Sequence, residues 1–116
     1  MLFVCYPACT TCKKAEAWLE SRKIGVEKRN IKEANPTEAE LRAWHACSGL
    51  PLKRFFNTSG LKYKELELSK RLPAMPEEEQ FRLLAYDGML VKRPILVGEG
   101  FVLVGFKEAE WEKALG

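Results

Sequence analysis

The 116-residue sequence predicts an α/β protein built on a four-stranded mixed sheet. Three observations lead to this prediction. A short apolar segment is followed at once by a helical pattern and a second strand, a block of helical patterns comes next, and two apolar segments around a Gly-Glu-Gly turn precede a closing helix. The first strand-helix-strand unit needs a crossover, so its two strands should pair in parallel with a right-handed connection. The last two strands should pair antiparallel as a hairpin.

The periodicity of the apolar residues predicts the first three elements. Residues 2–5 are apolar and indicate a short buried strand, after which Pro7 enforces a turn. A helix is expected over residues 13–23, where apolar side chains recur at helical spacing and Gly25 follows as a stop. Residues 26–31 (VEKRNI) have an apolar side chain at each end and polar side chains between them, and we expect a strand with one solvated face.

A helical insertion is predicted between the second and third strands, over about residues 36–88. Residues 35–38, Asn-Pro-Thr-Glu, indicate a helix start with a capping side chain, a proline at the first helical position and an acid near the positive end. Further helices are expected over residues 52–56, 61–72 and 76–88.

The last third of the chain changes to a strand period. Residues 94–97 and 101–104 are apolar and flank the turn, and a closing helix runs to Leu115. The order β-α-β, helices, then β-β-α, with a cysteine pair at the end of the first strand, is the thioredoxin-type architecture. We predict that residues 1–116 form one such domain, because this length can bury a core without disulfides.

Composition favours a soluble globular protein. The net charge is only +3, and the basic residues are spread along the chain rather than clustered as in nucleic-acid-binding proteins. No segment approaches the roughly 18 apolar residues of a membrane helix, and no cationic region precedes the first apolar run as in a signal peptide. We therefore expect a cytoplasmic monomer without direct membrane or nucleic-acid binding.

Cys9 and Cys12 indicate thiol–disulfide chemistry. Two residues separate them, and they lie where the first predicted strand passes into the first predicted helix. Free backbone N–H groups and the helix dipole stabilise a thiolate there, and the thiolate is the reactive form. Cys12 should stand one helical turn from Cys9, close enough to attack a mixed disulfide on Cys9. Thr10, Thr11 and Lys13 would add backbone donors and positive potential.

Two other uses of the pair are considered. The cysteines could form half of a zinc site with His45 and Cys47, although the spacing of those two residues does not form a second Cys-x-x-Cys. They could also be inert core thiols, since free cysteine is often buried as a small hydrophobe. The surrounding threonines and lysines favour a redox or nucleophilic site. We expect no metal and no bound cofactor, and assign no role to Cys5 or Cys47.

Four segments together resemble the arsenate reductase–Spx family, and they occur in the expected order along nearly the whole chain. These are residues 6–12 (YPACTTC), 55–60 (FFNTSG), 92–95 (KRPI) and 104–107 (VGFK). The resemblance implies a thioredoxin-like core with a helical insertion. It also implies a cis peptide bond before Pro94, which faces the cysteine site and places the Arg93 carbonyl beside the active thiol.

Within this family, glutaredoxin-linked arsenate reductases use one cysteine to attack arsenate, and three arginines are credited with handling the oxyanion. Cys9 fits the nucleophile and Arg93 fits the arginine before the proline. Asn57 and Gly105 stand at the other two arginine positions, with Arg54 three residues from the first. The resemblance therefore implies weaker oxyanion binding here, since each charge-assisted bond contributes about 1.5–3 kcal/mol.

The second branch, the Spx-type regulators, carries Cys-x-x-Cys as a disulfide switch and binds the C-terminal domain of the RNA polymerase α subunit. Cys12 supplies the second thiol that the arsenate enzymes lack, and Gly49 falls near the glycine that these regulators place at the polymerase contact. A redox-gated transcription regulator is therefore the alternative hypothesis, and a glutathione- or glutaredoxin-dependent arsenate reductase the third.

The leading hypothesis is an arsenate reductase-like thiol–disulfide oxidoreductase. Cys9 would be its nucleophile and Cys12 its resolving thiol. Arg93 would attract an anion or a glutathione carboxylate, and Pro94 would shape the substrate groove. Glutathione, glutaredoxin or thioredoxin would act as the redox partner.

Overall fold

The computed structural model describes residues 1–115, and its strands form one mixed sheet in the order β2-β1-β3-β4. Strand β1 (Leu2–Cys5) pairs in parallel with β2 (Glu27–Asn30) and antiparallel with β3 (Ile95–Gly98). Strand β3 pairs antiparallel with β4 (Phe101–Val104). The predicted fold class is confirmed, including the parallel first pair and the closing hairpin.

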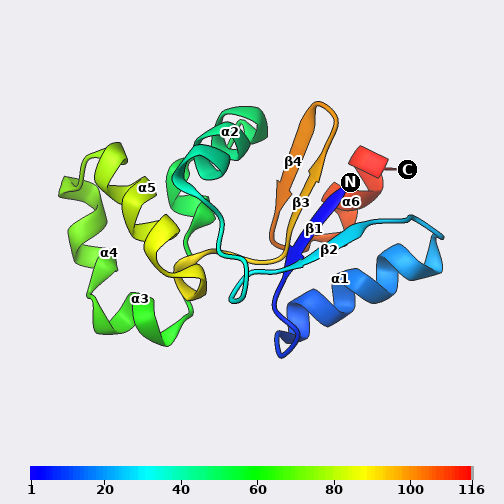
Figure 1. Ribbon diagram of the computed structural model, residues 1–116, viewed down its shortest axis with the longest axis horizontal. Coiled ribbons are helices and arrows are strands. Elements are labelled where there is room, and N and C mark those ends of the chain that lie inside the picture. Colours follow the sequence, from blue (N-terminus) through cyan, green and yellow to red (C-terminus); the bar gives the residue numbers. More distant parts are fainter. Residues whose placement is uncertain (116) are drawn as a thin grey trace.

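Helices cover both faces of this sheet (Figure 1). Two of them lie on one side, α1 (Thr10–Ser21) and α6 (Glu108–Leu115). The predicted helical insertion forms a block on the other side, made of α2 (Glu38–Ser48), α3 (Leu61–Glu65), α4 (Leu68–Arg71) and α5 (Glu77–Tyr86). Three 3₁₀ turns connect the block, η1 (Leu52–Phe55), η2 (Leu72–Ala74) and η3 (Gly88–Leu90). Within residues 1–115, no helix has the length and apolar character needed to cross a bilayer.

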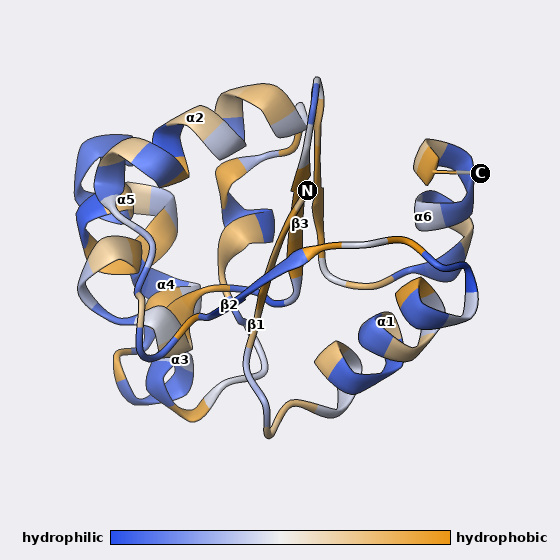
Figure 2. Cartoon of the chain, turned by 45° about the vertical axis from the view of Figure 1, so that its right-hand side comes forward, coloured by the Kyte–Doolittle hydropathy of each residue, from blue (hydrophilic) through white to orange (hydrophobic). Residues whose placement is uncertain are grey.

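Successive side chains of a strand point to opposite faces of the sheet, so the hydrophobic core consists of two clusters, one on each face. Phe3 and Leu96 face α1 and α6, where they join a cluster that contains Cys12. Val4 and Ile95 face the helical insertion and join a larger cluster. Figure 2 shows the central strands as apolar and β2 as polar, which suits an edge strand that must not pair with another chain.

Helix α1 begins three residues earlier than the sequence predicts. Cys9 has an extended backbone (φ −83°, ψ 121°) and takes the N-cap position, so helical hydrogen bonding starts directly after it. The helix also ends differently, because Lys23 rather than Gly25 adopts the left-handed conformation (φ 56°). The Ile24 N–H donates to the Leu19 carbonyl at 3.0 Å and closes the helix there.

The start of α2 lies two residues later than expected. Thr37 is the N-cap and forms a capping box with Glu40, so Pro36 precedes the cap instead of opening the helix. The Asn35 side chain donates to the Ala85 carbonyl at 2.7 Å and ties this turn to α5. Farther along, the predicted helix over residues 61–72 is broken, because Glu67 adopts a left-handed φ of 53°.

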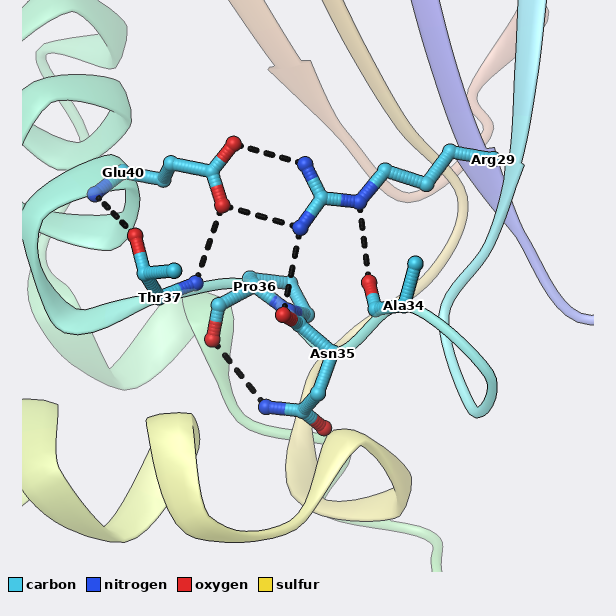
Figure 3. A network of polar contacts seen from close by, with 6 residues as sticks. All are labelled: Arg29, Ala34, Asn35, Pro36, Thr37 and Glu40. Atoms are coloured by element: carbon cyan, nitrogen blue, oxygen red, sulfur yellow. Dashed lines mark hydrogen bonds and ion pairs between the residues drawn. The ribbon is translucent and has the colours of Figure 1, made fainter.

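The turn from β2 into α2 is held by an ion pair between Arg29 and Glu40 (Figure 3). Two guanidinium nitrogens of Arg29 lie 2.6 and 2.8 Å from the Glu40 carboxylate oxygens. One of these oxygens also accepts the Thr37 N–H. Hydrogen bonding from Arg29 lowers the pKa of Glu40 to about 2.

We expect Glu40→Gln to lower the free energy of unfolding at pH 7 by about 1–2 kcal/mol, because it weakens the ion pair and the capping box. The pKa of Glu40 is depressed in the folded state, so its contribution is full above about pH 4.3 and is lost as pH falls toward about 2. Urea unfolding of both proteins should therefore show a difference at pH 7 that shrinks at acid pH. Glu38→Gln, which loses the exposed pair with Arg42, is the matched control and should cost less than about 0.5 kcal/mol. An equal loss in both variants would contradict this account.

Candidate active site

The two cysteines lie where β1 passes into α1, as predicted. Cys9 is the N-cap of α1 and Cys12 stands in its first turn. The connecting loop is closed by the Cys9 N–H, which donates to the Tyr6 carbonyl at 2.9 Å. The N–H of the same Tyr6 donates to the Cys12 sulfur at 3.4 Å. Cys9 is partly exposed while Cys12 is only 3% exposed, so a disulfide from solution meets Cys9 first.

The surroundings of Cys9 favour its thiolate. Burial alone would raise the pKa of the Cys9 thiol, but the Cys12 N–H, the Cys12 thiol and the Arg93 guanidinium together bring the pKa below its usual value. The first turn of α1 carries no acidic residue that would oppose this effect. Cys9 makes no capping hydrogen bond as a neutral thiol, which is a weak acceptor. As a thiolate, Cys9 becomes a much stronger acceptor for the backbone N–H of Cys12.

Cys12 has the opposite properties. Burial, together with the neighbouring Cys9, raises the pKa of Cys12 to about 12, although the Tyr6 N–H acts in the other direction. Burial also raises the pKa of Cys5, which lies in β1. The pair therefore consists of one accessible thiol whose thiolate form is favoured and one buried thiol whose thiolate form is disfavoured. This asymmetry is what a nucleophile and a resolving cysteine require.

Arg93 is the cation beside this pair. The peptide bond between Arg93 and Pro94 is cis, as the resemblance implied. The Arg93 guanidinium carbon lies 5.3 Å from the centre of the Tyr6 ring, a cation–π contact that holds the side chain in place. Its Nε and Nη1 atoms are buried and have no hydrogen-bond partner among residues 1–115. Buried donors are normally paired, so this orphaned pair indicates a place for an acceptor from a ligand.

A cavity of about 640 Å³ opens at Arg93. Asn57, from the loop after η1, also lines it, together with Lys62, Glu65 and Asp87. At the cavity wall where the resemblance implies an arginine, the chain thus supplies a neutral amide. The lining carries both positive and negative side chains.

The other predicted site residues surround the first turn of α1. Thr10, Thr11 and Lys13 are exposed there, while Pro94 is buried and its carbonyl accepts the Gly105 N–H at 2.8 Å. Thr11 lines a second cavity, of about 320 Å³. Tyr6 is a site residue that sequence reasoning missed, although an aromatic residue directly before the proline of the cysteine motif was a visible signal.

Of the remaining cysteines, Cys5 belongs to the same buried cluster as Cys12, whereas Cys47 and the histidine lie on the helical insertion. Cys47 is exposed on α2 and Cys5 is buried in β1. His45 packs its ring against Phe55 and Phe81, with centroids 5.7 and 5.6 Å apart. Within residues 1–115 no three His, Cys, Asp or Glu side chains are grouped so that they could hold a metal ion. The structure therefore does not bring His45 and Cys47 to the Cys9–Cys12 pair.

The chain resembles known proteins along nearly its whole length. The ArsC family matches residues 5–114. The chain is 49% identical over 113 residues to the uncharacterized protein YusI of Bacillus subtilis, across 97% of this chain and 96% of YusI. It is 29% identical over 109 residues to the global transcriptional regulator Spx of Enterococcus faecalis, across 94% of this chain and 81% of Spx.

Solved structures agree with this assignment. An ArsC family related protein from Bacteroides fragilis superposes with a TM-score of 0.94 at 61% identity, across 97% of this chain and 94% of the other. A protein described as a possible arsenate reductase from Streptococcus mutans superposes with a TM-score of 0.89 at 40% identity, across 98% and 97% of the two chains. The resemblance identified from the sequence is confirmed, and the chain belongs to the ArsC family.

Proposed function

We propose that this chain is a thiol–disulfide redox protein of the cytosol, with Cys9 as nucleophile and Cys12 as resolving thiol. The observation that carries the proposal is the asymmetry of the pair. Cys9 is accessible and its pKa is lowered, whereas Cys12 is buried and burial raises its pKa to about 12. Two inert core thiols would both be buried and protonated.

The first step is attack of the Cys9 thiolate on one sulfur of a substrate disulfide. A bond forms between that sulfur and Cys9, the substrate S–S bond breaks, and the other substrate sulfur leaves as a thiolate. Cys9 then carries no charge, so one of the influences that raise the pKa of Cys12 is removed. Cys12 can then lose its proton more easily, while the Tyr6 N–H stabilises the resulting thiolate.

In the second step the Cys12 thiolate attacks the Cys9 sulfur and releases the bound substrate sulfur as a thiol. The protein is left with a Cys9–Cys12 disulfide, and the substrate disulfide has gained two electrons. One proton comes from Cys12, and the thiolate that left in the first step takes the second proton from water. A thiol donor must then reduce the protein. The cavity at Arg93 supports glutathione in this role, because a carboxylate could meet Arg93 and Lys62 and the ammonium could meet Glu65 or Asp87.

The test is trapping of the mixed disulfide. In a Cys47→Ser background, which removes the exposed third thiol, Cys12→Ser should accumulate a stable adduct on Cys9 after treatment with glutathione disulfide. The parent protein should instead pass on to an internal disulfide. Intact mass and peptide mapping distinguish the two products. A glutathione adduct on Cys12 in the parent protein, or no adduct on Cys9 in Cys12→Ser, would contradict the proposed roles.

Replacing Arg93 should change how the reactivity of Cys9 depends on pH. Arg93→Gln removes a cation that lowers the pKa of Cys9, so less thiolate is present at neutral pH. We expect alkylation of Cys9 by iodoacetamide to slow by roughly threefold to tenfold at pH 7 and to approach the parent rate at alkaline pH. Arg93→Lys should retain most of the rate, and Lys64→Gln on α3 serves as the control for loss of one charge. An unchanged pH profile in Arg93→Gln would show that Arg93 does not act on the thiol.

A redox-gated transcription regulator is the second candidate. It is favoured by the Cys9–Cys12 pair together with the similarity to Spx. A pull-down with the C-terminal domain of the RNA polymerase α subunit, performed with the oxidised and the reduced protein, tests it. Binding in one redox state supports the regulator, and no binding in either state rules it out.

Arsenate reduction is a weaker third candidate, because Asn57 stands beside Arg93 where a cation would be needed. It predicts arsenate-dependent oxidation of glutathione that Cys9→Ser abolishes.

A further inference from the structure

A groove lined by positive side chains runs away from the first turn of α1. Its near part is the cavity of about 320 Å³ at Thr11, and its far part is a cavity of about 430 Å³. Arg54 and Lys92 line both cavities, so the two cavities adjoin at these side chains. Lys107 lines the near part and Lys53 the far part. We call this surface the basic groove.

The fold assembles these four cations from three distant segments. Lys53 and Arg54 belong to η1, Lys92 precedes β3, and Lys107 follows β4. The Lys92 side chain lies beside Gly105, where an added Cβ would come within 3.3 Å of the Lys92 Cε. Glycine at this position therefore leaves room for the lysine stem.

The charges of the basic groove are not balanced by the protein. No aspartate or glutamate is among the residues lining either cavity. Within residues 1–115, none of the four cations forms a salt bridge, whereas Arg22, at the C-terminal end of α1, is paired with Glu112 of α6. Like charges held together without counterions raise the local positive potential and attract an anionic partner.

We propose that the basic groove binds an acidic, extended polypeptide segment of a protein substrate and presents the disulfide of that substrate to Cys9. The proposal rests on the proposed function of Cys9. Thr11 lines the near end and stands in the first turn of α1, whose N-cap is Cys9, so the near end of the groove opens beside the turn that carries the thiol. Nucleic acid carries no disulfide and would have no use for this position.

The charges that line the basic groove favour an acidic peptide segment over a small zwitterionic thiol such as glutathione. A zwitterion needs an acceptor for its ammonium group, and Glu65 and Asp87 in the Arg93 cavity provide one. The basic groove provides none among its lining residues, and so suits a segment that carries carboxylates alone. The chemistry is the exchange already described: a bond forms between Cys9 and one substrate sulfur while the substrate S–S bond breaks.

The test compares two synthetic peptides that differ only in charge. Each carries one cysteine as a mixed disulfide with an uncharged thiol, flanked by glutamates in one peptide and glutamines in the other. In the Cys47→Ser background at low salt, the glutamate peptide should react with Cys9 about tenfold faster. This ratio should approach one at about 0.5 M salt, where the Debye length falls to about 4 Å.

Two double variants test whether the basic groove is responsible for the faster reaction of the glutamate peptide. Arg54→Gln combined with Lys107→Gln should reduce the tenfold ratio to about two or three. Lys70→Gln combined with Lys113→Gln removes the same net charge from exposed positions on α4 and α6 and should leave the ratio near ten. If both double variants lower the ratio equally, overall charge and not the groove is responsible, and the proposal is wrong.

A binding measurement separates this proposal from the proposed redox function. The glutamate peptide with serine in place of cysteine should bind the parent protein, by fluorescence anisotropy, more tightly than it binds the Arg54→Gln/Lys107→Gln variant. Binding without any reaction at Cys9 would uphold the groove and overturn the redox function. Reaction of both peptides at equal rates would uphold the redox function and overturn the groove, as would tighter groove binding of a single-stranded oligonucleotide.

Discussion

With Cys9 replaced by serine, the protein is expected to lose thiol–disulfide exchange at this site, by a factor of about 100 or more. A hydroxyl cannot form the mixed disulfide, and Cys12 is 3% exposed with its pKa raised by burial to about 12. The measurement is the rate of reduction of an uncharged aromatic disulfide, followed by absorbance. It is made in the Cys47→Ser background, because the exposed Cys47 would otherwise react in its place.

This loss should occur without loss of stability. Cys9 is an N-cap that makes no capping hydrogen bond, and serine is among the best capping residues. We expect Cys9→Ser to unfold at the same urea concentration as the parent or at a slightly higher one. If the variant keeps a substantial rate in the Cys47→Ser background, Cys9 is not the nucleophile.

Trp111→Ala is expected to have the largest effect on stability, a loss of about 3–5 kcal/mol. Trp111 is fully buried, and its ring centre lies 4.9 Å from that of Phe106 and 5.9 Å from that of Trp18. Its indole N–H donates to the Gly105 carbonyl at 3.1 Å, so truncation leaves a cavity and an unpaired acceptor. The midpoint of thermal unfolding should fall by roughly 10–20 °C.

Two variants control for this prediction. Trp111→Phe keeps an aromatic ring but loses the hydrogen bond, and should cost less than the alanine variant. Tyr86→Ala removes an aromatic ring that is 85% exposed, and should cost less than about 0.5 kcal/mol. Similar losses for Tyr86→Ala and Trp111→Ala would show that α6 is not packed as described.

The sheet could be predicted because its strands are short apolar segments bounded by turn residues, and because chain length between them fixes parallel or antiparallel pairing. The start of α1 could not, since Thr10 and Thr11 have low helix propensity and the helix depends on the extended backbone of Cys9. The break at Glu67 is similar, because a left-handed conformation at a non-glycine residue leaves no sequence signal.

The site was predictable only where its residues are neighbours in the sequence. The spacing of Cys9 and Cys12 was enough to indicate a redox pair, and its position at a strand–helix junction is confirmed. The basic groove was not predictable, because Arg54, Lys92 and Lys107 meet only after the helical insertion packs beside the closing hairpin. The pattern of residues within one segment does not predict which distant segments will come together in the fold.

The most direct test of the redox account is a titration of the Cys47→Ser protein against glutathione, with peptide mapping of the cysteines at each potential. The account predicts an internal Cys9–Cys12 disulfide, with a two-electron transition in the cytosolic range of roughly −200 to −320 mV. Uptake of glutathione on Cys9 at every oxidising potential, while Cys12 stays reduced, would contradict a resolving role for Cys12 and favour a mechanism with one thiol.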